Sequence, residues 1–454
     1  MAEAKKLPQY LAAVCVCIGA WGTGTAIAWT SNISEDLKNG RLNDLKITND
    51  ELGWIGSLMT LGAMCMCFPI GWIADKLGRK PTVLLTIVPF TVGWLMIIFG
   101  NNIAIIYVAR FLIGVAGGSF CVTAPMYTSE IAQTEIRGTL GTFFQLFITI
   151  GILYCGIFGF ALHVKLFNWF CLVIPIIFGV LFAFQPETPV YDLRNNKPDK
   201  AEKSFNKLRG KDYDHTGEVN IILADIENEK KMVSFKEAMK TKAAKKSTLI
   251  CFMLMFYQQL SGINAVMFYS QDIFVTAGST LKDSYCVIIL QTIQVIATVV
   301  SAWAVDKFGR RILLMISAAA MAFSTGLLGI FFSLKDREVL SESGVRSIGF
   351  IPVLSLNVFI IAFSLGFGPI PWLASSEMFS PEIKSICSSA AATFNWFLAF
   401  LVTKFYFACA KGLGTDMTFY IFTVISATAV FFVLIIIPET KGKTFAEIQH
   451  ELGS

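Results

Sequence analysis

The chain has 454 residues, of which 55% are hydrophobic and 15% charged, and its formal net charge is +5. A soluble domain usually has about 25% charged residues, so this composition excludes an ordinary soluble domain. We expect no nucleic-acid partner.

Twelve apolar stretches follow one another, and each is long enough to cross a bilayer core of about 30 Å. The first set lies at about 10–31, 53–74, 82–99, 103–126, 138–161 and 167–185, and the second at about 248–273, 284–304, 312–333, 350–376, 385–409 and 415–437. The first stretch is longer than the apolar core of a signal peptide, so we expect it to be a crossing. The sequence therefore predicts an all-α membrane protein of twelve transmembrane helices.

The distribution of basic residues predicts the orientation. Lys and Arg are concentrated in the loops after the even-numbered crossings, so we expect both termini to be cytoplasmic. The single N-x-S/T sequence begins at Asn32, which we expect in the first outer loop as a glycosylation site; a chance match is the alternative. The eleven cysteines are scattered and the three histidines form no cluster, so we expect neither a metal site nor a cofactor.

The polar segment 187–247 separates the two sets of crossings. Val219, Ile222, Leu223 and Ile226 fall on one helical face, and Ser234 with Glu237 has the pattern of a capping box. We expect a few short cytoplasmic helices here. The predicted organisation is a six-helix bundle at 1–186, this helical linker at 187–247, a second bundle at 248–440 and a cytoplasmic tail at 441–454.

Three motifs occur twice, in the same order and after corresponding crossings. They are Asp75-x-x-Gly78-Arg79-Lys80 with Asp306-x-x-Gly309-Arg310-Arg311, Glu130…Arg137 with Glu377…Lys384, and Pro186-Glu187-Thr188 with Pro438-Glu439-Thr440. The glycine of the first motif can end a helix and turn the chain sharply. Paired motifs indicate a duplicated six-helix unit, the architecture of alternating-access carriers with a site between the halves.

The charged residues of these motifs are candidates for a gate. We predict a gating network of Asp75, Arg79, Lys80, Glu130, Arg137, Glu187, Asp306, Arg310, Arg311, Glu377 and Glu439. Such a network would hold one conformation closed and open during transport. The alternative is that these charges only anchor the topology and solvate the surface.

Polar residues inside the crossings are mostly amides. They are Gln145, Gln258, Gln259, Asn264, Gln291, Gln294 and Asn395. Amides donate and accept hydrogen bonds without net charge, which suits a neutral polyol. The alternative for each amide is adhesion between helices.

Two crossings are interrupted, and interrupted helices are the best sequence indication of a carrier's site. Gly262 weakens crossing seven, and two glycines and two prolines precede Trp372 in crossing ten. Trp372 offers a flat ring to the C–H face of a sugar. Arg110 lies well inside crossing four, and because the first crossing contains no carboxylate we expect Arg110 to snorkel or to bind backbone carbonyls.

As a set, these motifs resemble those of the sugar porter family of the major facilitator superfamily over nearly the whole chain. The resemblance rests on Gly71…Lys80, Pro125-Met-Tyr-x-x-Glu130…Arg137-Gly138, Pro186-Glu-Thr-Pro189, Gln258-Gln-Leu-Ser-Gly-Ile-Asn264, Gly368-Pro-Ile-Pro-Trp372, Asn395-Trp396 and Pro438-Glu-Thr-Lys-Gly442. It implies the major facilitator fold and a sugar site lined by Gln145, Gln258, Gln259, Asn264, Gln294, Trp372 and Asn395. Within the family the chain is most similar to insect facilitated trehalose transporters.

The chain also departs from the family pattern. Proton-coupled members carry an aspartate where this chain has Gly24, which favours facilitated diffusion. Many glucose carriers have a glutamate where Ser364 stands, and Ser364 leaves a roomier region for a disaccharide. Lys384 replaces an arginine, so bidentate pairing is lost there.

We therefore predict a facilitative uniporter for trehalose or a hexose such as glucose, not an enzyme. We expect it to act as a monomer in the plasma membrane, with the sugar and the lipid bilayer as its partners. A proton-coupled sugar symporter and a nontransporting sugar sensor are the alternatives.

Overall fold

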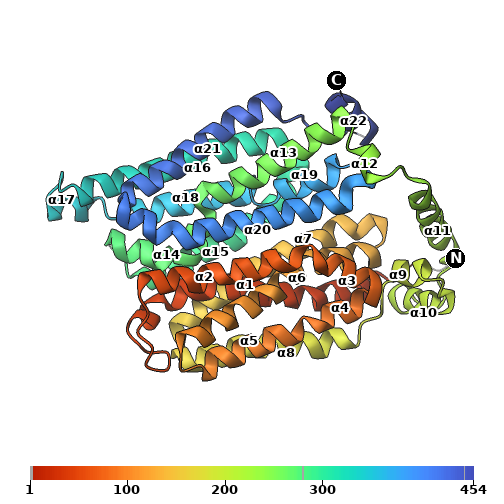
Figure 1. Cartoon of the computed structure of the whole chain (residues 1–454), viewed down its shortest axis with the longest axis horizontal. Helices are drawn as coiled ribbons and strands as arrows, with labels where there is room; N and C mark the ends of the chain where they lie inside the picture. Colours follow the sequence, from red (N-terminus) through yellow and green to blue (C-terminus); the bar gives the residue numbers. More distant parts are fainter. Residues whose placement is uncertain (1–3, 279–280, 444, 454) are drawn as a thin grey trace.

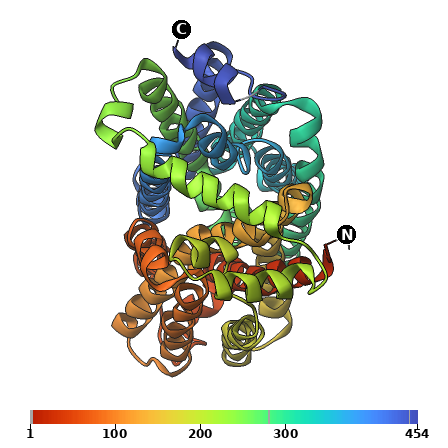
Figure 2. The same ribbon diagram turned by 90° about the vertical axis from the view of Figure 1, so that its right-hand side faces the viewer.

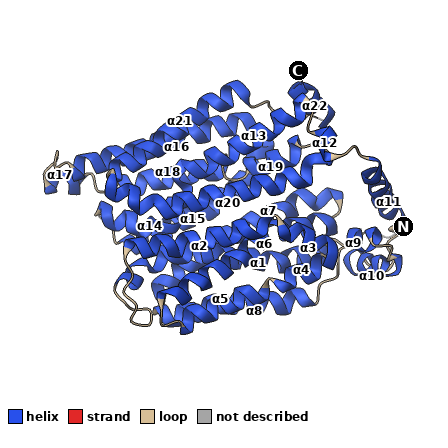
Figure 3. Ribbon diagram, viewed as in Figure 1, coloured by secondary structure: helices blue, strands red, loops and turns tan. Residues whose placement is uncertain are grey.

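The computed structural model describes residues 4–278, 281–443 and 445–453, and these residues form helices and loops without a strand (Figure 3). They contain 11 helices long and apolar enough to cross a membrane, and a bent pair makes up to 12. The predicted all-α fold of twelve crossings is therefore confirmed.

The first six crossings are built from α1 to α8. Their bounds are α1 (Leu7–Lys38), α2 (Asn49–Cys67) with α3 (Pro69–Leu77), α4 (Arg79–Leu85) with α5 (Ile87–Phe99), α6 (Ile103–Ile131), α7 (Thr134–Ala161) and α8 (Val164–Ala183). The bent pair is α2 and α3, which meet at 49°. The bend occurs at Pro69, the first residue of α3. Proline has no N–H to continue the helical hydrogen bonds, and its ring clashes with the preceding turn, so the helix bends there.

The second six crossings are built from α13 to α21. Their bounds are α13 (Lys242–Gln258), the π-helical turn η1 (Gln259–Ile263) and α14 (Asn264–Ala277), then α15 (Asp283–Phe308), α16 (Arg310–Asp336), α18 (Ile351–Leu365) with α19 (Ile370–Met378), α20 (Pro381–Gly412) and α21 (Thr415–Ile436). A short helix, α17 (Glu342–Ser347), joins α16 to α18. Figure 1 shows the two sets as two bundles lying side by side.

Both ends of the chain and the linker helices lie at one end of the bundles, which we call the linker side; the opposite end is the far side (Figures 1 and 2). The helices there are α9 (Pro189–Arg194), α10 (Pro198–Arg209), α11 (Thr216–Lys231), α12 (Phe235–Ala238) and α22 (Phe445–Gly453). Val219, Ile222 and Ile226 pack on a small apolar core around Phe205, as their spacing predicted, but Leu223, predicted on the same face, is 45% exposed. Arg209 connects this core to the first bundle, because its Nη1 donates to the Ile131 carbonyl at 2.7 Å.

The two bundles are joined by side chains near the far side. Ser31 Oγ of α1 lies 2.7 Å from Ser270 Oγ of α14. Lys38 forms an ion pair with Asp272, and Lys404 Nζ lies 2.8 Å from Asp50 Oδ1. Among the ion pairs between described residues, these two link the bundles, and both belong to the far ends of their helices. The structure is therefore held closed at the far side.

The expectation that Asn32 lies in an outer loop is wrong. Asn32 belongs to α1, which continues to Lys38. Its Nδ2 donates to the Ala28 carbonyl at 2.8 Å, and its Cβ faces Gly159 of α7. The apolar pattern ends before the helix does, because the last two turns are polar but still pack against neighbouring helices.

Candidate functional site

Four of the predicted amides meet in the second bundle, and we call Gln258, Gln259, Asn264 and Asn395 the amide cluster. Gln259 Nε2 donates to Asn395 Oδ1 at 2.6 Å, and Asn395 Nδ2 donates to Gln258 Oε1 at 2.6 Å. Asn264 Nδ2 donates to Gln259 Oε1. All four side chains are at most 9% exposed, so the cluster is a buried chain of neutral donors and acceptors.

The interruption of crossing seven positions this cluster. Gly262 has φ +96°, and a Cβ there would lie 2.6 Å from the Phe422 ring, so the position requires glycine. The chain forms the wide turn η1 at this point, which places Gln259 and Asn264 at its two ends. The predicted break at Gly262 is confirmed, and it turns consecutive amides toward α20.

The interruption of crossing ten meets the same cluster. Helix α18 ends at Leu365 and α19 begins at Ile370, as the glycines and prolines predicted. A helix end leaves backbone carbonyls without intrahelical partners. Gln258 Nε2 donates to two carbonyls in the break between the helices, those of Phe367 at 2.7 Å and Gly368 at 2.9 Å. Gln258 therefore joins the two broken crossings.

The other three predicted sugar ligands lie apart from the amide cluster. Gln145 is half-buried on α7, Gln294 is buried on α15, and Trp372 on α19 is 40% exposed. None of them shares a described hydrogen bond with the four clustered amides. Gln291 is also buried, and its Oε1 fills the space beside Gly156 of α7, so Gln291 packs between the bundles.

Arg110 is fully buried and bonded to neutral groups. Its Nε donates to the Ile55 carbonyl at 3.0 Å and its Nη1 to the Ala26 carbonyl at 2.9 Å. Its Nη2 lies 3.1 Å from Thr30 Oγ1. Of the two expected arrangements, the structure has the one in which Arg110 binds backbone carbonyls.

Gly24 lies where α1 and α7 are in close contact. A Cβ at Gly24 would lie 2.0 Å from the Ile148 carbonyl oxygen, and one at Gly151 would lie 2.1 Å from that of Trp21. Small residues allow such close contact between membrane helices. Any larger side chain at position 24, a carboxylate included, would force the two helices apart.

The first copy of the paired motifs forms a cluster on the linker side, the N-half cluster, made of Asp75, Arg79, Glu130 and Glu187. Arg79 lies 2.9 Å from both Asp75 and Glu130, and its side chain is 3% exposed. Glu187 accepts from the Lys80 N–H at 3.1 Å and the Thr188 N–H at 2.8 Å. Burial outweighs these donors and raises the pKa of Glu187 above its ordinary value of 4.5.

The second copy forms the C-half cluster, made of Arg310, Arg311, Glu377 and Glu439. Arg310 Nη2 lies 2.9 Å from Glu377 Oε1. Glu439 accepts from the N–H groups of Arg310 and Arg311 at 3.0 and 3.1 Å, and from that of Lys441 at 2.9 Å. Burial alone would raise the pKa of Glu439, but these backbone donors lower it below 4.5.

Not every residue of the predicted gating network joins a cluster. Lys80 Nζ donates to the Ala183 carbonyl at 2.7 Å. Lys384, which belongs to the repeated motif but not to the network, donates from Nζ to the Ser376 carbonyl at 3.0 Å. Arg137 is exposed and has no described ion pair. The side chain of Asp306 lies outside the described residues. The described ion pairs of each cluster stay within one bundle.

The sequence reasoning missed the two far-side ion pairs, Lys38–Asp272 and Asp50–Lys404. A signal was present, because Asp272 and Lys404 are charged residues within long apolar stretches. Such residues are costly in a membrane and usually have partners. Their partners lie more than two hundred residues away, so no local spacing connects them.

The sequence profile of the family described as "Sugar (and other) transporter" matches residues 10–452. The facilitated trehalose transporter Tret1 of Polypedilum vanderplanki is 37% identical over 98% of this chain and 88% of that protein. Tret1 of Aedes aegypti is 36% identical over 98% of this chain, which spans 55% of that longer protein.

A solved structure described as the inward-open conformation of the xylose transporter XylE from E. coli has a TM-score of 0.79 and 22% identity, with 97% of this chain and 98% of that chain covered. This likeness shows the fold, which is that of the major facilitator superfamily. The matching family and the Tret1 relatives are transporters, not enzymes. The chain therefore belongs to the sugar transporter family.

Proposed function

We propose that this protein is a facilitative transporter that carries trehalose, or a hexose such as glucose, across the plasma membrane as a uniporter. The sugar binds between the two bundles, which expose it alternately to the two sides. The linker side is cytoplasmic, as the distribution of Lys and Arg predicts.

The amide cluster carries this proposal. Its hydrogen bonds join one neutral amide to another, to a backbone carbonyl or to the Met255 sulfur, so a sugar hydroxyl can replace a partner without leaving a charge unpaired. The cluster lies where two broken crossings meet, and helix breaks at membrane depth are tolerated where they line a cavity. The Tret1 relatives favour trehalose as the first sugar to test.

Two neighbouring features favour uniport over proton coupling. Arg110 is occupied by carbonyl and hydroxyl oxygens, and Gly24 is pressed against the Ile148 carbonyl. A proton-coupled cycle needs a carboxylate that exchanges its proton as the site changes sides. The space that such a carboxylate would take near Arg110 is filled by the contact between α1 and α7.

Alternating access follows from the placement of the ion pairs. The structure is closed by contacts between the bundles at the far side, while the N-half and C-half clusters have their described ion pairs within single bundles. In the opposite state, the Lys38–Asp272 and Asp50–Lys404 pairs must separate. In the proposed cycle, the state with both far-side pairs formed exchanges sugar with the linker side.

The test is uptake of radiolabelled trehalose and glucose by proteoliposomes. We expect saturable uptake that ends at equal concentrations inside and outside. Asn395→Ala should reduce uptake at least about tenfold, because two cluster amides lose a partner at a cost of about 1–3 kcal/mol. Asn357→Ala is the matched control: Asn357 donates to the Val353 carbonyl of its own helix and lies outside the amide cluster.

An imposed pH gradient completes the test. Uniport predicts the same final sugar level with and without the gradient. Accumulation above the outside concentration would establish a proton symporter instead. Absence of uptake for both sugars by folded wild-type protein would refute the transport proposal.

A further inference from the structure

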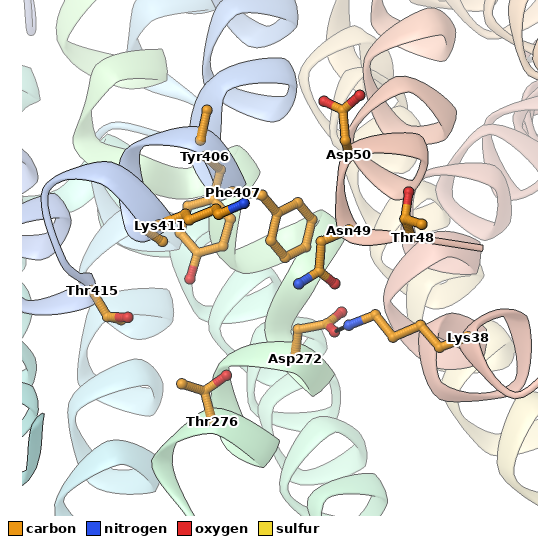
Figure 4. A pocket seen from close by; sticks show the side chains of 12 residues that line it. Lys38, Thr48, Asn49, Asp50, Asp272, Thr276, Tyr406, Phe407, Lys411 and Thr415 are labelled. Atoms are coloured by element: carbon orange, nitrogen blue, oxygen red, sulfur yellow. Dashed lines mark hydrogen bonds and ion pairs between the residues drawn. The ribbon is translucent and has the colours of Figure 1, made fainter. Parts of the chain in front are cut away.

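A cavity lies on the far side, away from the amide cluster. It has a volume of about 710 Å³ and opens between the far ends of α1, α2, α14, α20 and α21. Figure 4 shows Lys38 and Asn49 from the first bundle facing Asp272, Phe407 and Thr415 from the second. We call this cavity the vestibule.

Both carboxylates of the vestibule are paired with lysines. Its lining contains two lysines, Lys38 and Lys411, and two aspartates, Asp50 and Asp272. Lys38 is paired with Asp272, and Asp50 is paired with Lys404 just outside the lining. Because both carboxylates are neutralised by lysines, the lining does not favour a cation. It suits a neutral ligand with many hydroxyl groups, because the wall also offers threonine hydroxyls and the Asn49 amide.

Asp272 has an acceptor that is not used. Its side chain is 8% exposed and Oδ1 contacts Lys38, while Oδ2 has no hydrogen-bond partner among the described residues. A buried acceptor without a donor costs about 1–3 kcal/mol. Oδ2 is covered by protein, so a ligand hydroxyl that donates to it and removes this cost requires the Asp272 side chain to turn toward the cavity.

An aromatic wall stands opposite this carboxylate. Phe407 and Tyr406 both line the vestibule, and the Tyr406 ring stacks on that of Tyr269 at 5.5 Å. Lys38 Nζ lies 5.7 Å from the centre of the Phe407 ring. An apolar wall facing convergent polar groups is the usual composition of a small-molecule site, and the vestibule falls within the usual volume range of about 300–1,000 Å³.

We propose that the vestibule is a second binding site, one that takes a neutral sugar of disaccharide size from the outer solution while the far side is closed. It rests on the proposed function for the identity of the ligand and for the outward position of the far side. The contacts between α1 and α14, including the Ser31–Ser270 hydrogen bond, separate it from the amide cluster. The chain thus holds two sugar sites in series, and the outer site is occupied first.

The test is protection of a cysteine from a maleimide. Thr415 begins α21, is half-buried and lines the vestibule, so Thr415→Cys places a reactive thiol on its wall. The purified full chain, with and without Asn395→Ala, is labelled in the presence of increasing trehalose. Mass spectrometry of the peptide that contains position 415 keeps the native cysteines out of the measurement. Labelling of Ser343→Cys on α17, outside the vestibule, measures how far the viscosity of the trehalose solution alone slows the maleimide reaction.

We expect trehalose to slow labelling at position 415 in both proteins, by about tenfold at ten times the dissociation constant. Equal protection in the Asn395→Ala protein shows that the occupied site is the vestibule. Protection that disappears with Asn395→Ala would come from the amide cluster and would overturn the inference. Unchanged or faster labelling would overturn it as well.

Asp272→Asn provides a second variant. It removes the charge that faces Lys38 but keeps the shape of the side chain, and it should weaken protection by trehalose at least about threefold, a loss of one hydrogen bond to a charged group. The proposed function fails separately: protection without uptake in proteoliposomes refutes transport and leaves the vestibule site, whereas uptake without protection refutes the vestibule site alone.

Discussion

The N-half and C-half clusters are two copies of one motif, and they are held together differently. In both, a glutamate after the sixth crossing of its bundle accepts from the backbone N–H groups at the start of a helix. In both, an arginine forms an ion pair with a glutamate at the end of another crossing. The two copies therefore share the same contacts between glutamate and backbone N–H groups.

The copies differ in burial and in the balance of charge. The Arg79 side chain is 3% exposed, whereas that of Arg310 is 14% exposed. Glu187 has its pKa raised by burial, whereas Glu439 has its pKa lowered because backbone donors outweigh burial. The N-half cluster therefore depends on a buried ion pair, and the C-half cluster depends more on backbone hydrogen bonds. A cluster of the second kind tolerates the loss of one side chain better.

The largest difference should follow removal of the two arginines. Arg79→Ala should lower the free energy of unfolding by about 3–5 kcal/mol, because it leaves Glu130 partly buried without its cation. Arg310→Ala should cost less, since its partner Glu377 is more exposed. Thermal unfolding of the purified protein in detergent measures both changes.

An exposed pair provides the control for this comparison. Arg194 and Glu229 lie 2.9 Å apart on the linker, and their side chains are 36% and 51% exposed. Arg194→Ala should change stability by about 0–1 kcal/mol, as surface ion pairs do. Equal losses for Arg79→Ala and Arg310→Ala would contradict the difference between the clusters.

The next largest loss of stability should follow replacement of the turn glycine, and it should be the same in both copies. Gly78 has φ +107° and Gly309 has φ +90°, both with ψ near 160°, a region that only glycine adopts readily. A Cβ would lie 2.5 Å from Glu187 Oε2 in the first copy and 2.7 Å from Glu439 Oε2 in the second. Gly78→Ala and Gly309→Ala should each destabilise by about 1–3 kcal/mol.

Gly138 is the matched control for these two glycines. It lies within α7, and a Cβ there would meet nothing within 4 Å. Gly138→Ala should therefore stabilise the helix by about 0.5–1 kcal/mol. In thermal unfolding, the control should therefore raise the unfolding temperature, whereas Gly78→Ala and Gly309→Ala should lower it. If Gly78→Ala were neutral while Gly309→Ala was harmful, the two turns would not be equivalent.

The positions of these glycines show what the sequence could predict. The paired motifs, the apolar stretches and the glycine and proline breaks are local patterns, and each determines a local structure. They predicted the crossings, the turns at Gly78 and Gly309, and the interruptions at Gly262 and before Trp372. The amide cluster was predicted in part, because only four of the seven proposed sugar ligands lie together.

The misses have a common physical cause. Lys38–Asp272 and Asp50–Lys404 join bundles that are far apart in the chain, and their geometry depends on how the bundles meet. Asn32 was assigned to a loop because polar residues follow it, but α1 continues for more than a turn beyond it. Packing between helices stabilises polar turns that hydropathy alone would exclude from a helix.

The smallest effect should appear on acidification, and it should have opposite signs in the two clusters. The raised pKa of Glu187 means that the folded protein binds this proton more tightly than the unfolded chain. Its contribution to stability therefore grows as the pH falls toward and below 4.5. The lowered pKa of Glu439 gives a contribution that is present above 4.5 and is lost as the pH falls below that value.

Glu187→Gln and Glu439→Gln isolate these contributions, each of which should be below about 1 kcal/mol, as for partly exposed charges. Between pH 7 and pH 4, the wild type should gain stability relative to Glu187→Gln and lose stability relative to Glu439→Gln. Unfolding midpoints at several pH values, compared within each wild-type and variant pair, cancel the titration of all other groups. If stability changed with pH in the same direction in both wild-type and variant pairs, the two glutamates would have the same balance of burial and backbone donors. The two clusters would then differ only in the burial of their arginines.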